Sequence, residues 1–197
     1  SGSIAFNDYS SNYNLHLRNC NFANYSGGLS MYVAWQTPYT NNTTDYCNLY
    51  STGPTLARYG NEFATLQALQ TGTNQNLHGV SAEPLFASDD PDVFQSALDS
   101  AAIPIAGIVV DIDGATRNAT TPDIGAKEFT LLAHDVGAKL LVSPETYCGL
   151  SNAEEITIRI QNYGSSFETG FDVAYSMNGA GWTVENVGAL SVSPGGT

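Results

Sequence analysis

Apolar and polar residues alternate over much of the first half of the chain, in short runs separated by polar turns. In the clearest run, four apolar side chains fall on one face of an extended segment: Leu29, Met31, Val33 and Trp35. Because successive side chains of a strand point to opposite faces, this alternation predicts a half-buried β-strand. Residues 45–50 predict the next strand, after a polar turn at residues 38–44.

A three-residue pattern recurs in this half of the chain. The tripeptide Cys20-Asn21-Phe22 is followed 27 positions later by Cys47-Asn48-Leu49, with the same order of cysteine, asparagine and large apolar residue. Roughly 20–30 residues is the length of one coil in a parallel β-helix or a related solenoid. The spacing therefore predicts stacked coils, and a chance recurrence is the competing explanation.

One segment favours a helix. Its apolar residues are spaced three apart: Phe63, Leu66 and Leu69. This spacing predicts a short helix over residues 61–70, and Gly72 stands where a glycine commonly ends a helix. We expect the helix to pack against the side of a sheet. Further strands are predicted over two segments: residues 83–87 and 103–112.

The last third of the chain predicts a second domain. Strand patterns cover residues 138–142, 155–163 and 171–177, and a hairpin turn is predicted at Asn178-Gly179. Strands at this spacing are typical of an immunoglobulin-like β-sandwich, of which we expect about five strands instead of seven. The chain ends on a turn at residues 193–197 that we expect to lead into another strand. The predicted domains are residues 1–130 and an incomplete sandwich at residues 134–197.

Composition narrows the class of protein. Among 197 residues, 19 are acidic and 6 are basic, so the formal net charge is -13. Six scattered cations cannot neutralise a run of phosphates, which argues against nucleic acid as a partner. The chain has no stretch of about 18 apolar residues, so no membrane span is predicted. The N-terminal residues lack the basic start and the apolar run of a signal peptide. Abundant Asn and Thr with little Lys favour an extracellular protein.

The most specific motif of the chain is Asp111-Ile112-Asp113-Gly114, followed by Arg117 and by Pro122-Asp123-Ile124-Gly125-Ala126-Lys127-Glu128. Its upstream companions are residues 45–50, 56–60, 65–72 and 83–86. With these pieces, residues 45–129 resemble the closing coils of right-handed parallel β-helix proteins secreted by Bacteroidetes-type bacteria. The turn Ser100-Ala101-Ala102 departs from that family, in which a glycine is common there, and the departure concerns the geometry of this turn.

A second set of motifs lies in the last third of the chain: Asp135-Val136-Gly137, Ser143-Pro144, Cys148-Gly149-Leu150-Ser151, Ile156-Thr157-Ile158, Asn162-Tyr163-Gly164 and Tyr175-Ser176-Met177-Asn178-Gly179. Residues 135–197 thereby resemble the CARDB-like immunoglobulin-type modules often fused behind such coils. Together the two resemblances imply a large modular protein at the cell surface or outside the cell, commonly exported by the type IX secretion route. Some β-helix relatives cleave polysaccharides, and others are adhesin-like stalks.

We therefore expect a non-catalytic structural or adhesive segment that presents or spaces other domains. Arg18 and Arg58 are the only basic residues of the early coils, and no pattern links them to acids. His16 alternates with apolar neighbours and is expected to point away from the core. One alternative is the C-terminal part of a polysaccharide lyase or glycoside hydrolase whose active site lies upstream, and another is a glycan-binding module. The expected partners are neighbouring domains of the same polypeptide and a polysaccharide or cell-surface glycan.

The candidate metal ligands are Asp111, Asp113 and Asp123. The sequence Asp-x-Asp-Gly resembles half of a calcium loop, because calcium binds several carboxylate oxygens from a segment turned by glycine. A full loop needs a third ligand two residues on, where this chain has Ala115. The favoured interpretation is that these carboxylates accept hydrogen bonds from backbone N–H groups and pair with Arg117, which stabilises the end of the coils. No other cofactor is predicted.

Aromatic residues suggest a surface on which sugar rings stack. Its candidates are Tyr32, Trp35 and Tyr39, with Tyr46, Tyr50 and Tyr59 as further members. Packing in the core or on the flanks of the coils is the favoured interpretation of the same residues. Three cysteines are present, and Cys20 and Cys47 are expected to be neighbours, either as a disulfide or as buried reduced thiols. The third is Cys148.

Overall fold

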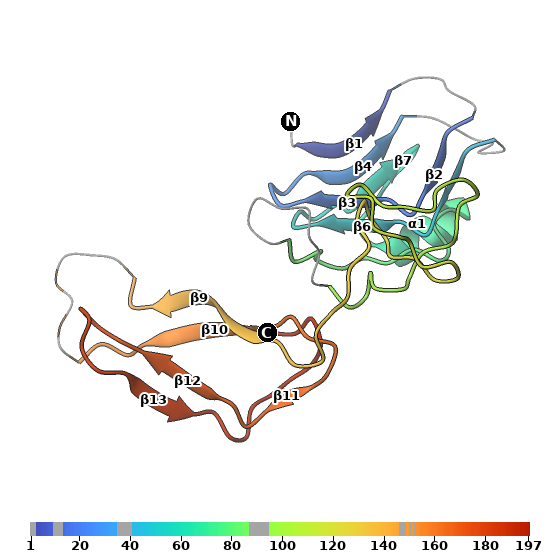
Figure 1. Ribbon diagram of the computed structural model, residues 1–197. Helices are drawn as coiled ribbons and strands as arrows, with labels where there is room; N and C mark the ends of the chain where they lie inside the picture. Colours follow the sequence, from blue (N-terminus) through green and yellow to red (C-terminus); the bar gives the residue numbers. More distant parts are fainter. Residues whose placement is uncertain are drawn as a thin grey trace. The chain divides into compact units, whose positions relative to one another are not determined.

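The computed structural model describes residues 3–9, 14–34, 41–86, 95–145, 149, 151 and 153–197. Contacts divide the chain into two compact units, Ser1–Thr130 and Leu131–Thr197, here named unit 1 and unit 2. Both units consist mainly of β-strands, and the helix of the described ranges is α1 (Leu66–Thr73) (Figure 1). This content confirms the predicted all-β class. The described ranges contain no helix with the length and apolar character of a membrane span.

In the described part of unit 1, the strands β1 to β8 form three stacks, and the helix α1 follows them in the sequence. In the first stack β1 (Ile4–Asp8), β4 (Leu29–Val33) and β7 (Ala57–Tyr59) run parallel, and β8 (Asn61–Phe63) is added antiparallel to β7. The second stack pairs β2 (His16–Arg18) with β5 (Thr43–Asp45), and the third pairs β3 (Asn21–Asn24) with β6 (Asn48–Ser51), both in parallel. The stacked strands are visible in Figure 1.

The three stacks share nearly the same sequence offset. In the first stack Ile4 pairs with Leu29 and Met31 with Ala57. In the second stack the partner of His16 is Thr43, and in the third the partner of Asn21 is Asn48, which gives both stacks one identical offset. The recurring tripeptides therefore occupy equivalent positions of successive strands, as their spacing predicts.

The repeated asparagine adds side-chain hydrogen bonds to the backbone pairing. Asn48 is fully buried, and its Nδ2 donates to Oδ1 of Asn21 at 2.9 Å and to the carbonyl of Ala82 at 2.9 Å. Its Oδ1 accepts from the N–H of Ala82 at 2.9 Å. An isolated parallel bridge joins Asn48 to Val80, so the pairing continues beyond β6. One side chain thus connects three successive segments of the chain.

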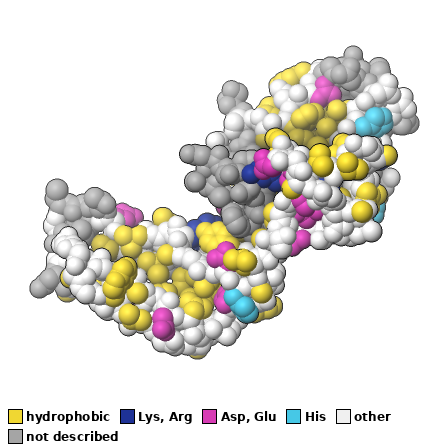
Figure 2. All heavy atoms as spheres, in the orientation of Figure 1, with side chains coloured by type: hydrophobic (Ala, Val, Ile, Leu, Met, Phe, Trp, Pro, Cys, Tyr) yellow, Lys and Arg dark blue, Asp and Glu magenta, His cyan; other side chains and the backbone are white. Residues whose placement is uncertain are grey.

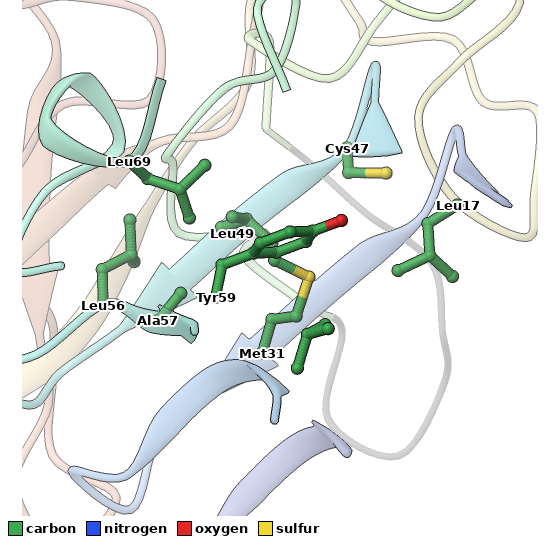
Figure 3. Packing of buried hydrophobic residues seen from close by; sticks show 9 residues of the cluster. Leu17, Met31, Cys47, Leu49, Leu56, Ala57, Tyr59 and Leu69 are labelled. Atoms are coloured by element: carbon green, nitrogen blue, oxygen red, sulfur yellow. The ribbon is translucent and has the colours of Figure 1, made fainter. Parts of the chain in front are cut away.

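The core of unit 1 lies between the stacks. Inward positions of the strands and the helix, with the residues just before β6 and β7, supply its fully or nearly fully buried side chains: Leu17, Met31, Val33, Cys47, Leu49, Leu56, Ala57, Tyr59 and Leu69 (Figure 3). The alternation of Met31 and Val33 confirms the predicted inward face of β4. His16 and Arg18 are exposed on either side of buried Leu17, which confirms the predicted orientation of His16.

Helix α1 differs in its bounds from the helix that the apolar spacing predicts. Phe63 belongs to β8, because its backbone pairs with that of Ala57. The helix begins after Thr65, whose hydroxyl accepts from the N–H of Ala68 at 3.2 Å, and ends at Asn74, a left-handed residue with φ of 56°. Gly72 lies inside the helix. A Cβ there would lie 2.7 Å from Cε1 of Phe63, so the glycine makes room for that ring.

The strand predicted over residues 45–50 is interrupted. Tyr46 adopts a left-handed conformation with φ of 54°, which separates β5 from β6 and turns the chain from one stack to the next. Asn19 has φ of 56° at the corner between β2 and β3. The separation of these two corners along the chain equals that of the strands they connect.

Residues 95–130 of unit 1 form turns with isolated bridges, in contrast to the strand predicted over residues 103–112. Ile105 bridges to Ile108 and Val110 to Thr116, which leaves several apolar side chains exposed. Likewise, the segment predicted as a strand over residues 83–87 holds one bridge residue in its described part. A second small core, centred on Leu98, Ala102 and Ile124, holds the turns together.

In its described residues, unit 2 has six strands in three antiparallel pairs. These are β9 (Val136–Ser143) with β10 (Thr157–Asn162), β11 (Glu168–Thr169) with β14 (Ser191–Val192), and β12 (Asp172–Tyr175) with β13 (Thr183–Asn186). Between β12 and β13, Asn178 and Gly179 have φ of 53° and 75°, as the predicted turn requires. Hydrophobic side chains of unit 2 are widely exposed (Figure 2), among them Leu140, Leu141, Trp182 and Val184.

Candidate functional site

The candidate metal ligands lie in the turns of residues 95–130, where two of them are buried. Asp111 accepts three backbone hydrogen bonds, each of 2.9 Å. The N–H groups of Asp113 and Ala115 reach its Oδ1, and that of Glu128 reaches its Oδ2. The hydrogen bond from Glu128 is the main reason why the pKa of Asp111 lies below its usual range. Asp111 therefore closes its own turn and attaches it to the segment that contains Glu128.

Asp123 makes a similar connection to two other parts of the same region. Its Oδ1 accepts from the N–H of Ser100 at 2.7 Å, and its Oδ2 from the N–H of Phe129 at 2.6 Å. Burial raises the pKa of Asp123 to about 6, against the two hydrogen bonds, which favour the charged form. Ser100, in the turn Ser100-Ala101-Ala102, has φ of 55°, a left-handed conformation that glycine adopts most readily.

Arg117 also forms hydrogen bonds with these turns. Its guanidinium donates to the carbonyls of Gly125 at 2.7 Å and Asp123 at 3.2 Å, and lies 3.4 Å from Oε2 of Glu128. Both carboxylate oxygens of Glu128 also accept backbone N–H groups, those of Asn118 and Asp123. With these partners, Arg117 and Glu128 fix the positions of the turns around them.

Asp113 takes a different position from the two buried aspartates. Its carboxylate forms an ion pair of 3.0 Å with Lys127 and its side chain is 59% exposed. No group of three His, Cys, Asp or Glu side chains in the described ranges has the arrangement of a metal site. The backbone hydrogen bonds of Asp111 and Asp123 are those that the structural interpretation of the motif predicts, whereas the ion pair of Arg117 is with Glu128. Calcium binding at Asp111, Asp113 and Asp123 stays a prediction, tested below.

The candidate stacking residues are distributed over different surfaces of unit 1. Tyr32 lies on the outer face of β4, where its ring centroid is 4.6 Å from that of Tyr9 and 5.2 Å from the guanidinium carbon of Arg58. Tyr59 is fully buried in the core, which contradicts its assignment to an exposed aromatic surface. The inward parity of β7 explains its burial. Trp35 and Tyr39 lie outside the described residues.

The two cysteines at equivalent positions before β3 and β6 are reduced thiols. Their backbones are adjacent, since the N–H of Asn48 donates to the carbonyl of Cys20 at 2.8 Å. A hydrogen bond from the thiol of Cys47 lowers the pKa of Cys20 to about 7, and the same interaction raises the pKa of Cys47. The expectation that they are neighbours is confirmed. Cys148 lies outside the described residues.

A polar cluster that the sequence did not indicate lies at the corner after β5. Oδ2 of Asp45 is 2.9 Å from Nδ1 of His78, and its Oδ1 accepts from the N–H groups of His78 and Tyr46. The rings of Tyr46 and His78 stack with centroids 4.7 Å apart. Because Asp45 and His78 are 33 positions apart in the sequence, the fold of unit 1 is what brings them together.

Arg18 lies in the wall of a groove beside this corner. Two adjoining cavities, of about 500 Å³ and about 470 Å³, both include Arg18 and Ile103 in their walls. The first is lined mainly by apolar residues of the 103–109 turn, and the second by polar residues of β5 and of the segment after α1. Cavities of this size are typical of sites for small ligands.

Searches with protein-family models, among curated proteins and among solved structures found no match to this chain.

Proposed function

We propose that this chain is a non-catalytic structural or adhesive segment of a large secreted cell-surface protein, and that it presents or spaces other domains. Residues 1–130 would form the terminal coils of a right-handed parallel β-helix, and residues 134–197 an immunoglobulin-like sandwich of the CARDB type. The observation that carries the proposal is the parallel pairing of the three stacks of unit 1 at a nearly constant sequence offset.

Stacked parallel coils suit a structural role for a physical reason. Each coil pairs its backbone with the next through strands in the same register, so the hydrogen bonds and the core continue along the stack. The buried amide of Asn48 adds a connection between adjacent coils. A segment built in this way can hold other domains at a fixed spacing.

The strongest charged cluster also supports a structural role. Asp111, Asp123 and Glu128 accept backbone N–H groups from the turns around them, and Arg117 donates to carbonyls of the same turns. Catalytic carboxylates at glycosidase separation need free oxygens directed toward a substrate. Here the oxygens of the buried acids stabilise the chain that follows the stacked strands.

Two measurements on the whole chain test the proposal. The first is incubation with acidic and neutral polysaccharides, followed by absorbance of unsaturated uronates and by assay of new reducing ends. We expect no product above the rate without protein, while a commercial lyase run in parallel gives both signals. Sustained product formation that requires this chain would contradict a non-catalytic segment.

The second measurement is resistance to thermolysin, because a spacer must stay folded. We expect unit 1 to remain intact under conditions that digest the Leu49→Ala variant, in which a fully buried core side chain is truncated. Leu77 is 51% exposed, so Leu77→Ala is the matched control and should resist like the unaltered chain. Rapid cleavage of the unaltered chain inside the strand stacks would contradict a rigid segment.

A further inference from the structure

Arg18 is a cation of unit 1 for which the described residues provide no hydrogen-bond acceptor and no ion-pair partner. Its side chain extends from the outer face of β2, beside Asp45 on β5, and it has no acceptor among the described residues. The other three cations of the unit are engaged. Arg117 donates to backbone carbonyls, Lys127 pairs with Asp113, and Arg58 donates to the carbonyl of Gly60 over the ring of Tyr32. The formal net charge of the chain is -13, so free cations are scarce. A guanidinium that lines a groove without a protein partner can form charge-assisted hydrogen bonds with an anionic ligand.

The polar cavity beside Arg18 adds hydrogen-bond donors. Asn42 is only 3% exposed, and its Oδ1 accepts from the N–H of Leu15 at 2.9 Å. Oε1 of Gln75 accepts from the N–H of Thr44 at 2.7 Å. These backbone bonds fix each amide oxygen, so the amino groups of Asn42 and Gln75 are left on the cavity wall without acceptors in the described part of the chain.

The carboxylate of the same cavity is already occupied, and Oγ1 of Thr44 is a buried hydroxyl that can donate as well as accept. Both carboxylate oxygens of Asp45 accept from Tyr46 or His78. A peptide laid in this groove would bring backbone N–H groups that need acceptors. A chain of sugar rings brings hydroxyl oxygens that accept hydrogen bonds and rotate to suit their partners. The open donors of Arg18, Asn42 and Gln75 therefore favour an oxygen-rich ligand over a peptide.

We propose that the groove along β2 and β5 binds an acidic glycan, with a carboxylate or sulfate group of the glycan on the guanidinium of Arg18. The amino groups of Asn42 and Gln75 donate to oxygens of the same or the adjoining sugar. The apolar cavity next to it, with Ile103 and Ile105 in its wall, receives the carbon-bound face of a ring. This site goes beyond the structural role and is independent of the aromatic surface around Tyr32.

The test is calorimetric titration of the whole chain with four oligomers of similar length. A galacturonate oligomer carries carboxylates, a sulfated dextran oligomer carries sulfates, a dextran oligomer is neutral, and a glutamate oligomer is an acidic peptide. We expect one or both acidic glycans to bind and the neutral and peptide oligomers to bind at least tenfold more weakly. Binding of the carboxylated but not the sulfated glycan, or the reverse, identifies the anionic group.

Three variants test whether the acidic glycan binds in this groove. Arg18→Gln removes the cation and should weaken binding of the acidic glycan at least tenfold. Gln75→Glu keeps an oxygen for the N–H of Thr44 but replaces the amino group with a second oxygen, and should also weaken binding at least tenfold. Arg159→Gln removes the same charge from an exposed position of β10 in unit 2 and should change affinity less than twofold.

Four outcomes would overturn the proposal. They are failure of the unaltered chain to bind either acidic glycan, equal binding of neutral dextran, binding of the glutamate oligomer as tight as that of the glycans, and unchanged affinity in Arg18→Gln. Thermal melting of each variant accompanies the titration. Since Arg18 is exposed, its variant should melt like the unaltered chain, which separates a loss of binding from a loss of folding.

Discussion

Replacing Asn48 with alanine tests the parallel stacking of the strands at a fully buried polar side chain. The substitution removes three hydrogen bonds, two to the backbone of Ala82 and one to Oδ1 of Asn21. Asn48 is fully buried, so water cannot reach the Ala82 groups without local opening. At about 1 kcal/mol for each bond, the variant should lose about 3 kcal/mol of unfolding free energy.

The assay must report on unit 1 alone, and the buried thiol of Cys47 provides the signal. Cys47 is fully buried in the core of unit 1, so labelling of its peptide by a thiol reagent across a urea series follows unfolding of that unit. With a urea dependence of about 2 kcal/mol per molar, the midpoint of Asn48→Ala should fall by about 1.5 M. Mass spectrometry separates the Cys47 peptide from those of the other cysteines.

Asn61→Ala is the matched control. Asn61 is exposed on β8, and truncating an exposed side chain should change stability by less than about 0.5 kcal/mol. If Asn48→Ala and Asn61→Ala unfold at the same urea concentration, the amide of Asn48 is not buried between paired strands. The register that places it opposite Asn21 would then be refuted.

The charged and reactive groups of unit 1 give three more predictions. The pKa of Asp123 is about 6 in the folded chain and 3.8 as the ordinary value, so its contribution to stability is fully present below about pH 4 and is lost as pH rises through 6. Stability of the unaltered chain relative to Asp123→Asn should therefore fall by about 1–2 kcal/mol between pH 4 and pH 7, and a rise would contradict the burial of this carboxylate. If Asp111 and Asp123 serve the turns alone, the melting temperature should be equal in EDTA and in millimolar calcium, whereas a calcium-dependent rise would favour the metal site. Alkylation of Cys20 should show a pKa of about 7, and Cys47→Ala should move it toward the ordinary value of 9.0 because it removes the main cause of the shift; an unchanged profile would show that the two thiols do not interact.

The stacking of unit 1 was predictable because residues of the same type repeat at the same spacing. Asparagine and a large apolar residue recur at positions 21–22 and 48–49, and the pairing register places them directly opposite each other. The break between β5 and β6 was not predictable. It depends on a left-handed tyrosine at position 46, a conformation for which the sequence carries no glycine signal.

Helix α1 and the 103–112 segment show how tertiary pairing overrides local pattern. Phe63 fits the helical spacing, but β8 uses its backbone to pair with β7, and the helix starts after the capping residue Thr65. Thr65 itself was a signal that could have located this start. The apolar run at 103–112 lacks a neighbouring strand of sufficient length among the described residues, so it forms turns with exposed side chains.

The candidate sites likewise contain contacts that the sequence predicts and contacts that it does not. The bonding of Asp111 within its own turn was predictable, since an aspartate before a glycine turn commonly accepts nearby N–H groups. The partners of Asp123 at Ser100 and the members of the Arg18 groove were not, because Arg18, Asn42 and Gln75 are far apart in sequence. Only the register of the strands and the path of the chain after α1 bring such residues together.

NMR of the isotopically labelled chain can show whether the strands of unit 1 pair in parallel at a nearly constant offset. Nuclear Overhauser contacts between backbone protons should connect Asn21 with Asn48, Phe22 with Leu49 and Met31 with Ala57, advancing in the same direction along both strands. Contacts that advance in opposite directions along these strands, or that join Asn21 to a different segment, would contradict the account.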